Sequence, residues 1–203
     1  MELAWSAIFA EAGAVVADQV LLRDTNIEGI ASGDRRQIDF VAWGVRGFSR
    51  PICGDATIVS PLHSDGTPYA LTPDIDGASF LRAVARKEAT YPELARQNQY
   101  GELTVLACET GGRWHHRALT MVAKLIEVKT QTIVPLLRQA TALAYYRRWW
   151  GSILSTALQR TVPTNLLDHP GMGNMPGLGP EPPLGGLLQI AIEILEVSRL
   201  PLR

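Results

Sequence analysis

The chain has 203 residues, of which 46% are hydrophobic and 19% are charged, and its formal net charge is −1. These values are typical of one globular domain with a substantial core, and they leave room for a tail. They exclude a strongly basic or strongly acidic protein but remain compatible with a nucleic-acid partner, because local patches of charge matter more than the sum.

The ends and the cysteines set further limits. The first residues lack the basic region of a signal peptide, and no apolar run approaches the roughly 20 residues of a membrane span. We therefore expect an intracellular protein with no membrane segment. Cys53 and Cys108 lie in apolar, strand-like runs, which favours buried thiols over a disulfide. No C-x-x-C or Cys/His cluster occurs, so we expect no zinc site.

The first part of the chain predicts one helix followed by three strands. Apolar residues recur at helical spacing at the start, and runs rich in Val, Ile and Phe follow between turn-forming segments. The second and third strands are expected to pair as a hairpin with a longer loop. The expected ranges are 4–14 for the helix and 14–24, 37–45 and 52–61 for the strands.

The second part of the chain predicts helices around one further strand. The segment 76–94 has a helical pattern up to Pro92, which should end or kink the helix. A strand is expected at 102–109, and two helices are expected between 114 and 160 with a break near Pro135. The order predicts an α/β (mixed α+β) domain with a central sheet of about four strands flanked by helices, and a helical C-terminal part.

Composition divides the chain into three parts. Residues 163–186 are rich in Pro and Gly and poor in large apolar side chains, which is typical of a linker. We therefore expect a folded domain at 1–162, a linker at 163–186 and a short terminal helix at 187–203.

Two aspartates lie inside the expected hairpin. Asp39 is in the second expected strand and Asp55 in the third, each among apolar neighbours. If the two strands pair, the carboxylates can face one side at neighbouring positions. Carboxylates placed together repel each other unless a divalent cation binds between them, and oxygen ligands favour Mg²⁺ or Mn²⁺. The alternative is that each Asp ends a strand and accepts a hydrogen bond from a turn.

Lys87 occupies a position where an apolar residue is expected. Phe80, Val84, Lys87 and Tyr91 form one stripe of a helix, and only three of the 19 basic residues are lysines. A lysine that points to a core needs carboxylate partners or a chemical role. The alternative is a lysine at the edge of the stripe whose ammonium reaches solvent. Two acids and a lysine around a divalent cation can hydrolyse a phosphodiester.

These residues lie in the segments QIDFVAWG, CGDATIVSP, ARKEATYPEL and LTVLACETGGRW. Taken in this order, the segments resemble the restriction-like endonuclease domain of LINE-type (non-LTR) retrotransposon polyproteins, a branch of the PD-(D/E)XK nuclease superfamily. The resemblance covers roughly residues 10–160. It implies a restriction-endonuclease-like core, Mg²⁺ (or Mn²⁺) as cofactor, DNA as the partner that is nicked, and a nuclear location.

The resemblance also implies roles for single residues. Asp39 and Asp55 match the two acids that hold the metal, Lys87 matches the helical lysine that acts with them in catalysis, and Tyr91 matches the tyrosine after it. Ile38 stands where the family has a proline, and Thr90 where it often has a second lysine. An alternative therefore stays open, namely a catalytically inactive nucleic-acid-binding or structural remnant of such a domain.

Three further residues are secondary candidates. Glu11 lies on the first expected helix, where members of the superfamily sometimes add an acid, although a solvated helix residue is the alternative. Glu109 ends the expected strand at 102–109. Arg113, in the turn that follows, has the charge to contact a phosphate, although this segment is equally typical of a capped helix start.

Overall fold

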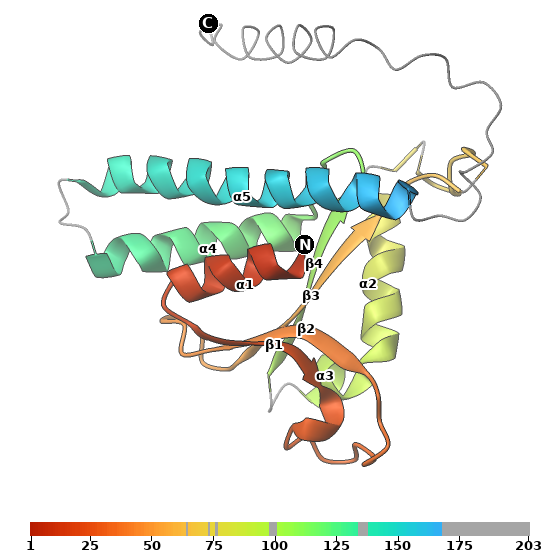
Figure 1. Ribbon diagram of the computed structural model, residues 1–203, viewed down its shortest axis with the longest axis horizontal. Coiled ribbons are helices and arrows are strands. Elements are labelled where there is room, and N and C mark those ends of the chain that lie inside the picture. Colours follow the sequence, from red (N-terminus) through yellow and green to blue (C-terminus); the bar gives the residue numbers. More distant parts are fainter. Residues whose placement is uncertain (64, 73, 76, 98–100, 134–137, 168–203) are drawn as a thin grey trace, which may run out of the picture. The chain divides into compact units, whose positions relative to one another are not determined.

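The computed structural model describes residues 1–63, 65–72, 74–75, 77–97, 101–133 and 138–167 (Figure 1). Contacts between residues divide the chain into two units, Met1–Thr164 and Asn165–Arg203. The first unit contains the sheet and all the helices described below except the end of the last one. The terminal helix expected at 187–203, and most of the expected linker, lie outside the described residues.

The first unit has the mixed α/β fold and the four-stranded sheet that the sequence predicts. Its helices and strands follow the expected order, with two additional short helices, a 3-10 helix after the first strand and an α-helix that begins at Pro92. In chain order they are α1 (Glu2–Glu11), β1 (Val15–Leu21), the 3-10 helix η1 (Leu22–Asp24), β2 (Gln37–Trp43), β3 (Ile52–Val59), α2 (Ala78–Thr90), α3 (Pro92–Gln97), β4 (Glu102–Glu109), α4 (His116–Ile133) and α5 (Gln139–Leu167).

The sheet has the strand order β1-β2-β3-β4. β1 pairs with β2 and β2 with β3 in antiparallel fashion, so the predicted hairpin is confirmed. β3 and β4 are parallel, which requires a crossover connection, and α2 and α3 provide it. The parallel pair is matched along its whole length, from Ile52↔Glu102 to Val59↔Glu109.

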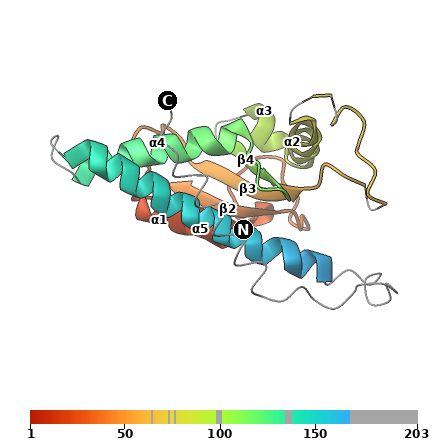
Figure 2. The same ribbon diagram turned by 90° about the horizontal axis from the view of Figure 1, so that it is seen from above.

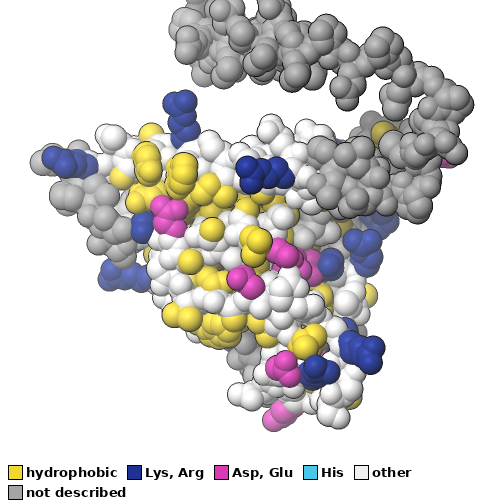
Figure 3. All heavy atoms as spheres, in the orientation of Figure 1, with side chains coloured by type: hydrophobic (Ala, Val, Ile, Leu, Met, Phe, Trp, Pro, Cys, Tyr) yellow, Lys and Arg dark blue, Asp and Glu magenta, His cyan; other side chains and the backbone are white. Residues whose placement is uncertain are grey.

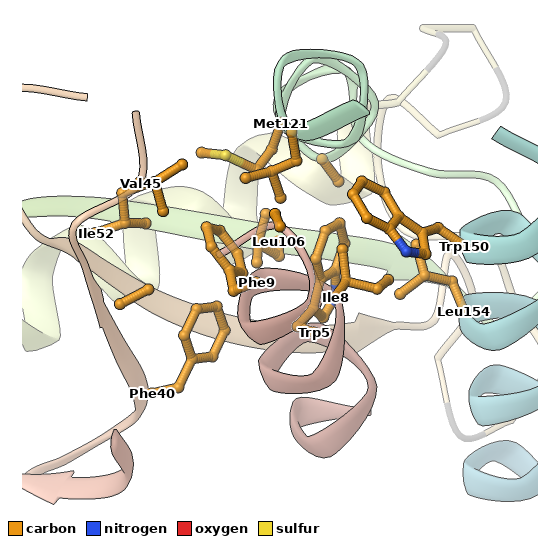
Figure 4. Close-up of a cluster of buried hydrophobic side chains, with 14 of the residues drawn as sticks. Trp5, Ile8, Phe9, Phe40, Val45, Ile52, Leu106, Met121, Trp150 and Leu154 are labelled. Atoms are coloured by element: carbon orange, nitrogen blue, oxygen red, sulfur yellow. The ribbon is translucent and has the colours of Figure 1, made fainter. Parts of the chain in front are cut away.

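One face of the sheet is covered by α1, α4 and α5, and α2 lies on the other side (Figure 1). Figure 2 shows the same arrangement from above, with α2 seen end-on. The core under α1 is aromatic: Trp5 and Phe9 have no exposed surface, and Phe9 packs on Phe40 of β2 with a ring separation of 5.1 Å (Figure 4). Trp150 of α5 packs against the same cluster and is fully buried (Figure 4).

The second core lies between the opposite face of the sheet and the crossover helices. Phe80 and Ala83 of α2 and Leu94 of α3 are buried there against Val105 of β4. The helical stripe read from the sequence is therefore the face of α2 that packs on the sheet. Lys87 belongs to this stripe, which places it above the strands.

Two prolines bear on the predicted helix ends. α2 ends at Thr90, just before Pro92, as the sequence predicts. Pro92 begins α3, because proline suits the first position of a helix, where an N–H has no partner to lose. α5 continues to Leu167, so the linker does not begin at 163 as expected. A proline removes one helical hydrogen bond but does not prevent the residues after it from continuing the helix.

Hydrophobic side chains gather on the surface along α5 (Figure 3). Tyr145 and Trp149 are 58% and 45% exposed there. Among the described helices, none has the length and apolar character needed to cross a membrane. Cys53 and Cys108 are buried free thiols, as predicted.

Candidate functional site

The candidate site lies where β2 and β3 separate. Their pairing runs from Ala42↔Ile52 to Phe40↔Gly54, so the next positions along the two strands are Asp39 and Asp55. At this point the backbone N–H of Ala56 donates to Oδ2 of Asp39 at 2.7 Å. The Asp39 carboxylate thus takes the place of a strand carbonyl. The separation of the strands keeps Asp39 partly open to solvent while it stays beside Asp55.

Lys87 reaches the same point from α2. Its Nζ donates to Oδ2 of Asp55 at 2.7 Å. The Asp55 side chain is 1% exposed and the Lys87 side chain is 23% exposed, so the ion pair has a buried and a solvent-facing end. The structure brings the three side chains near one another: Lys87 pairs with Asp55, and Asp39 lies opposite Asp55 on the neighbouring strand. Lys87 is therefore a partly exposed lysine whose ammonium is paired with a buried carboxylate.

The electrostatics of Asp39 follow from this arrangement. Burial raises the pKa of Asp39 to about 6, and the negative charge of Asp55 contributes in the same direction. The hydrogen bond from Ala56 and the charge of Lys87 oppose the rise in this pKa. Two carboxylates share one ammonium, so the local charge is negative when both are ionised.

Glu2 is a residue that sequence reasoning missed. It lies in the first turn of α1, and its charge also raises the pKa of Asp39. A signal was present in the sequence, because Glu2, Trp5 and Phe9 follow helical spacing and the two aromatic residues are buried. An acid on the apolar stripe of a helix is as unusual as the lysine on the stripe of α2.

Tyr91 ties the end of α2 to the start of β2. Its hydroxyl donates to the backbone carbonyl of Gln37. Burial raises the pKa of Tyr91 to about 12, and the charges of Asp55 and Asp39 add to the rise. Tyr91 is therefore a neutral phenol near the carboxylates, and its hydroxyl contacts both the Gln37 carbonyl and the Asp55 carboxylate.

Arg36 makes a second tie between the same two elements, and sequence reasoning also missed it. Its guanidinium donates to the carbonyl of Thr90 at 2.6 Å and to both carboxylate oxygens of Glu93, at 3.0 and 2.8 Å. It also pairs with Asp34 at 2.7 Å. The ends of the elements that carry Asp39 and Lys87 are thus held together by a bidentate ion pair and by the Tyr91 hydrogen bond.

One oxygen of the carboxylate pair is left without a partner in the described part of the chain. Oδ1 of Asp55 is buried and, among the described residues, has no hydrogen-bond partner. An orphaned carboxylate oxygen beside a second carboxylate is what a divalent cation would satisfy. In the described part of the chain no group of three His, Cys, Asp or Glu side chains is arranged to hold a metal. The donor set fits Mg²⁺, which is commonly held by one or two carboxylates with water and substrate phosphate as the other ligands.

The secondary candidates have other partners. Oε2 of Glu11 accepts hydrogen bonds from the indole N–H groups of Trp150 at 2.8 Å and Trp149 at 3.2 Å, so Glu11 joins α1 to α5. Glu109 is buried and pairs with Arg113 through two bonds of 2.8 and 2.9 Å. These three residues have structural partners, and in the described part of the chain no hydrogen bond joins Glu11 or Glu109 to Asp39, Asp55 or Lys87.

The fold and the cluster together define a mixed α/β domain with a carboxylate pair and a lysine at a split in its sheet. The sequence matches no protein-family model. No curated protein matches it either.

Proposed function

We propose that this domain is a metal-dependent endonuclease that hydrolyses phosphodiester bonds of DNA. The observation that carries the proposal is the carboxylate pair itself. Asp39 and Asp55 lie side by side at the split between β2 and β3, Oδ1 of Asp55 is buried without a partner, and Lys87 stands 2.7 Å from the other oxygen.

Each residue has a role in this reaction. A bound Mg²⁺ or Mn²⁺ polarises the phosphate and lowers the pKa of a water molecule. Asp39 and Asp55 would hold this cation, and Asp39 is mostly ionised above pH 6 because its pKa is about 6. The Lys87 ammonium would orient the attacking water or stabilise the negative charge that develops on the phosphate. Tyr91 would keep α2, and therefore Lys87, in place above β2.

The resemblance noted in the sequence supports the same reaction. The chain presents a strand acid, a second strand acid and a helical lysine in the order implied by the restriction-like nucleases of non-LTR retrotransposons. The strand–strand–helix–strand arrangement of β2, β3, α2 and β4 accommodates that order. We extend the proposal to a domain of retrotransposon origin that acts on nuclear DNA.

Nicking of supercoiled plasmid tests the proposal. The parent protein should nick DNA with Mg²⁺ or Mn²⁺ and not with EDTA. Asp39→Asn and Asp55→Asn keep the side-chain shape but remove the charge, and each should reduce the rate by about 100-fold or more, the scale of losing one electrostatic group from an active site. Glu88→Gln is the matched control, because Glu88 is an exposed acid next to Lys87 whose partner is Arg117 at 3.4 Å.

The controls separate catalysis from folding. Each variant should keep the circular dichroism spectrum of the parent, and Glu88→Gln should nick DNA at the parental rate. If the folded parent does not nick DNA with any divalent cation, the nuclease proposal is wrong and the domain is a nucleic-acid-binding or structural remnant. Equal rates for the parent and Asp55→Asn would contradict the role of Asp55 in the reaction.

A further inference from the structure

We propose that a groove beside the carboxylate pair binds phosphate groups of the nucleic-acid strand that enters the site. We call it the arginine groove, and it is lined by Ile58 and Ser60 at the end of β3, by Tyr69, and by Arg82 and Arg86 of α2. Its volume is about 220 Å³. This inference rests on the proposed function, because it names a substrate contact of the same site.

The arginine groove lies further along the edge of β3 that faces β2, beyond Asp55. β3 pairs with β2 only as far as Gly54, although it runs on to Val59. The N–H of Ala56 points to this edge, because it donates to Asp39. Backbone groups of a strand alternate in direction, so the N–H of Ile58 points to the same edge about 6.6 Å further along. One strand edge therefore leads from the carboxylate pair to the groove.

Helix α2 connects the two places as well. Arg86 is adjacent in sequence to Lys87, and Arg82 lies four residues before Arg86, about 6 Å along the helix axis. Lys87 points to the sheet, whereas both arginines are exposed on the flank of α2. A nucleic-acid strand with one phosphate at Lys87 can place its neighbouring phosphates against Arg82 and Arg86.

Within the residues that the structure describes, no acidic side chain neutralises the charge of the arginine groove. None of the residues that line it is acidic, and no carboxylate in the described part of the chain forms an ion pair with Arg82 or Arg86. By contrast, Arg36 and Arg113 are paired with carboxylates. Two guanidinium groups are thus available to bind an external anion.

Arg82 is also held in place before any ligand binds. Its guanidinium carbon lies 3.4 Å from the centroid of the Tyr69 ring. Stacking on an aromatic ring fixes the guanidinium plane and leaves its N–H edge free for hydrogen bonds. The geometry of that edge matches two oxygens of a phosphate.

DNA binding at increasing salt concentration tests this inference. Binding of a fluorescent DNA duplex is measured with EDTA present, so that no cleavage occurs. Each phosphate contact contributes about 0.9 to the slope of log Kobs against log salt concentration, so Arg82→Ala/Arg86→Ala should reduce its magnitude by about 1.8. The loss should be the same for duplexes of different sequence, because phosphate contacts carry no sequence information. Arg82→Lys/Arg86→Lys keeps both charges and should retain most of the slope.

The matched control is Arg147→Ala/Arg148→Ala, which removes two exposed arginines from α5. It should leave the slope unchanged. An unchanged slope in Arg82→Ala/Arg86→Ala, an equal loss in the α5 control, or a parent that binds no DNA would each overturn the proposal of the arginine groove. These outcomes distinguish the arginine-groove proposal from the nuclease proposal. A parent that binds through the groove but never cleaves refutes only the nuclease, and a parent that cleaves with no change of slope in the groove variant refutes only the groove.

Discussion

Gly54→Ala tests the register that brings Asp39 beside Asp55. Gly54 pairs with Phe40, and both residues directly flank the two aspartates. A Cβ atom at Gly54 would lie 2.0 Å from Cζ and 2.3 Å from Cε1 of Phe40, which is fully buried. The ring must therefore shift within a closed core, and overpacking of this kind costs about 1–3 kcal/mol. The lower backbone entropy of alanine in the unfolded chain offsets roughly 0.4–1 kcal/mol of this.

Urea denaturation measures the effect, with two companion variants. Gly111→Ala is the control, because no atom lies within 4 Å of its Cβ position, and the change should be within about 0.5 kcal/mol. In Phe40→Leu/Gly54→Ala the smaller side chain relieves the overlap, so the double variant should be more stable than the sum of the single changes by about 0.5–3 kcal/mol. Gly54→Ala at parental stability, or strict additivity in the cycle, would refute the register and with it the proximity of the two carboxylates.

Three further predictions concern single side chains. Lys87→Met should destabilise the domain by about 3–5 kcal/mol at pH 7 in urea denaturation, because the buried Asp55 loses its partner. The double variant Asp55→Asn/Lys87→Met should lose less stability than Lys87→Met. Equal stability of Lys87→Met and the parent would contradict the ion pair. The pKa of Asp39 is raised from the ordinary value of 3.8 to about 6, so the folded state binds the proton more tightly, and the free energy of unfolding should fall as pH rises from about 4 to 6. Asp39→Asn should lack this fall, and an unchanged pH profile would count against the raised pKa. Glu11→Ala should lower the free energy of unfolding by about 1–3 kcal/mol, because the indole N–H of Trp150 loses its acceptor. Cation binding should not change in this variant. A loss of cation binding would place Glu11 in the site.

The arrangement of helices and strands was largely predictable because periodicity reports which faces are buried. The stripe of α2 and the apolar run of β3 are examples. The strand order and the parallel pairing of β3 with β4 follow once α2 and α3 form a crossover between them. The end of α5 was not predictable from composition, because a single proline at 163 does not stop the residues after it from continuing the helix.

The core of the candidate site was also predictable, because its residues break the patterns around them. Asp55 lies in a buried strand and Lys87 on an apolar helical stripe, and each needs the other. The acid on the first helix was assigned less well. Glu2 and Glu11 lie at opposite ends of α1, and the packing of that helix on the sheet decides which end approaches Asp39. Arg36 could not be recognised, because its partners Thr90 and Glu93 are more than fifty residues away in the sequence.

Calorimetric titration of the protein with Mn²⁺ in the absence of DNA tests the carboxylate pair most directly. The account predicts saturable binding that Asp55→Asn abolishes and Glu88→Gln retains. Because the pKa of Asp39 is about 6, Mn²⁺ binding at pH 6 should release protons, whereas Mn²⁺ binding at pH 8 should not. The measured binding enthalpy should therefore depend on the buffer at pH 6 only. A parent that binds no Mn²⁺, or an Asp55→Asn variant that binds it as tightly as the parent, would contradict the assignment of Asp39 and Asp55 as metal ligands.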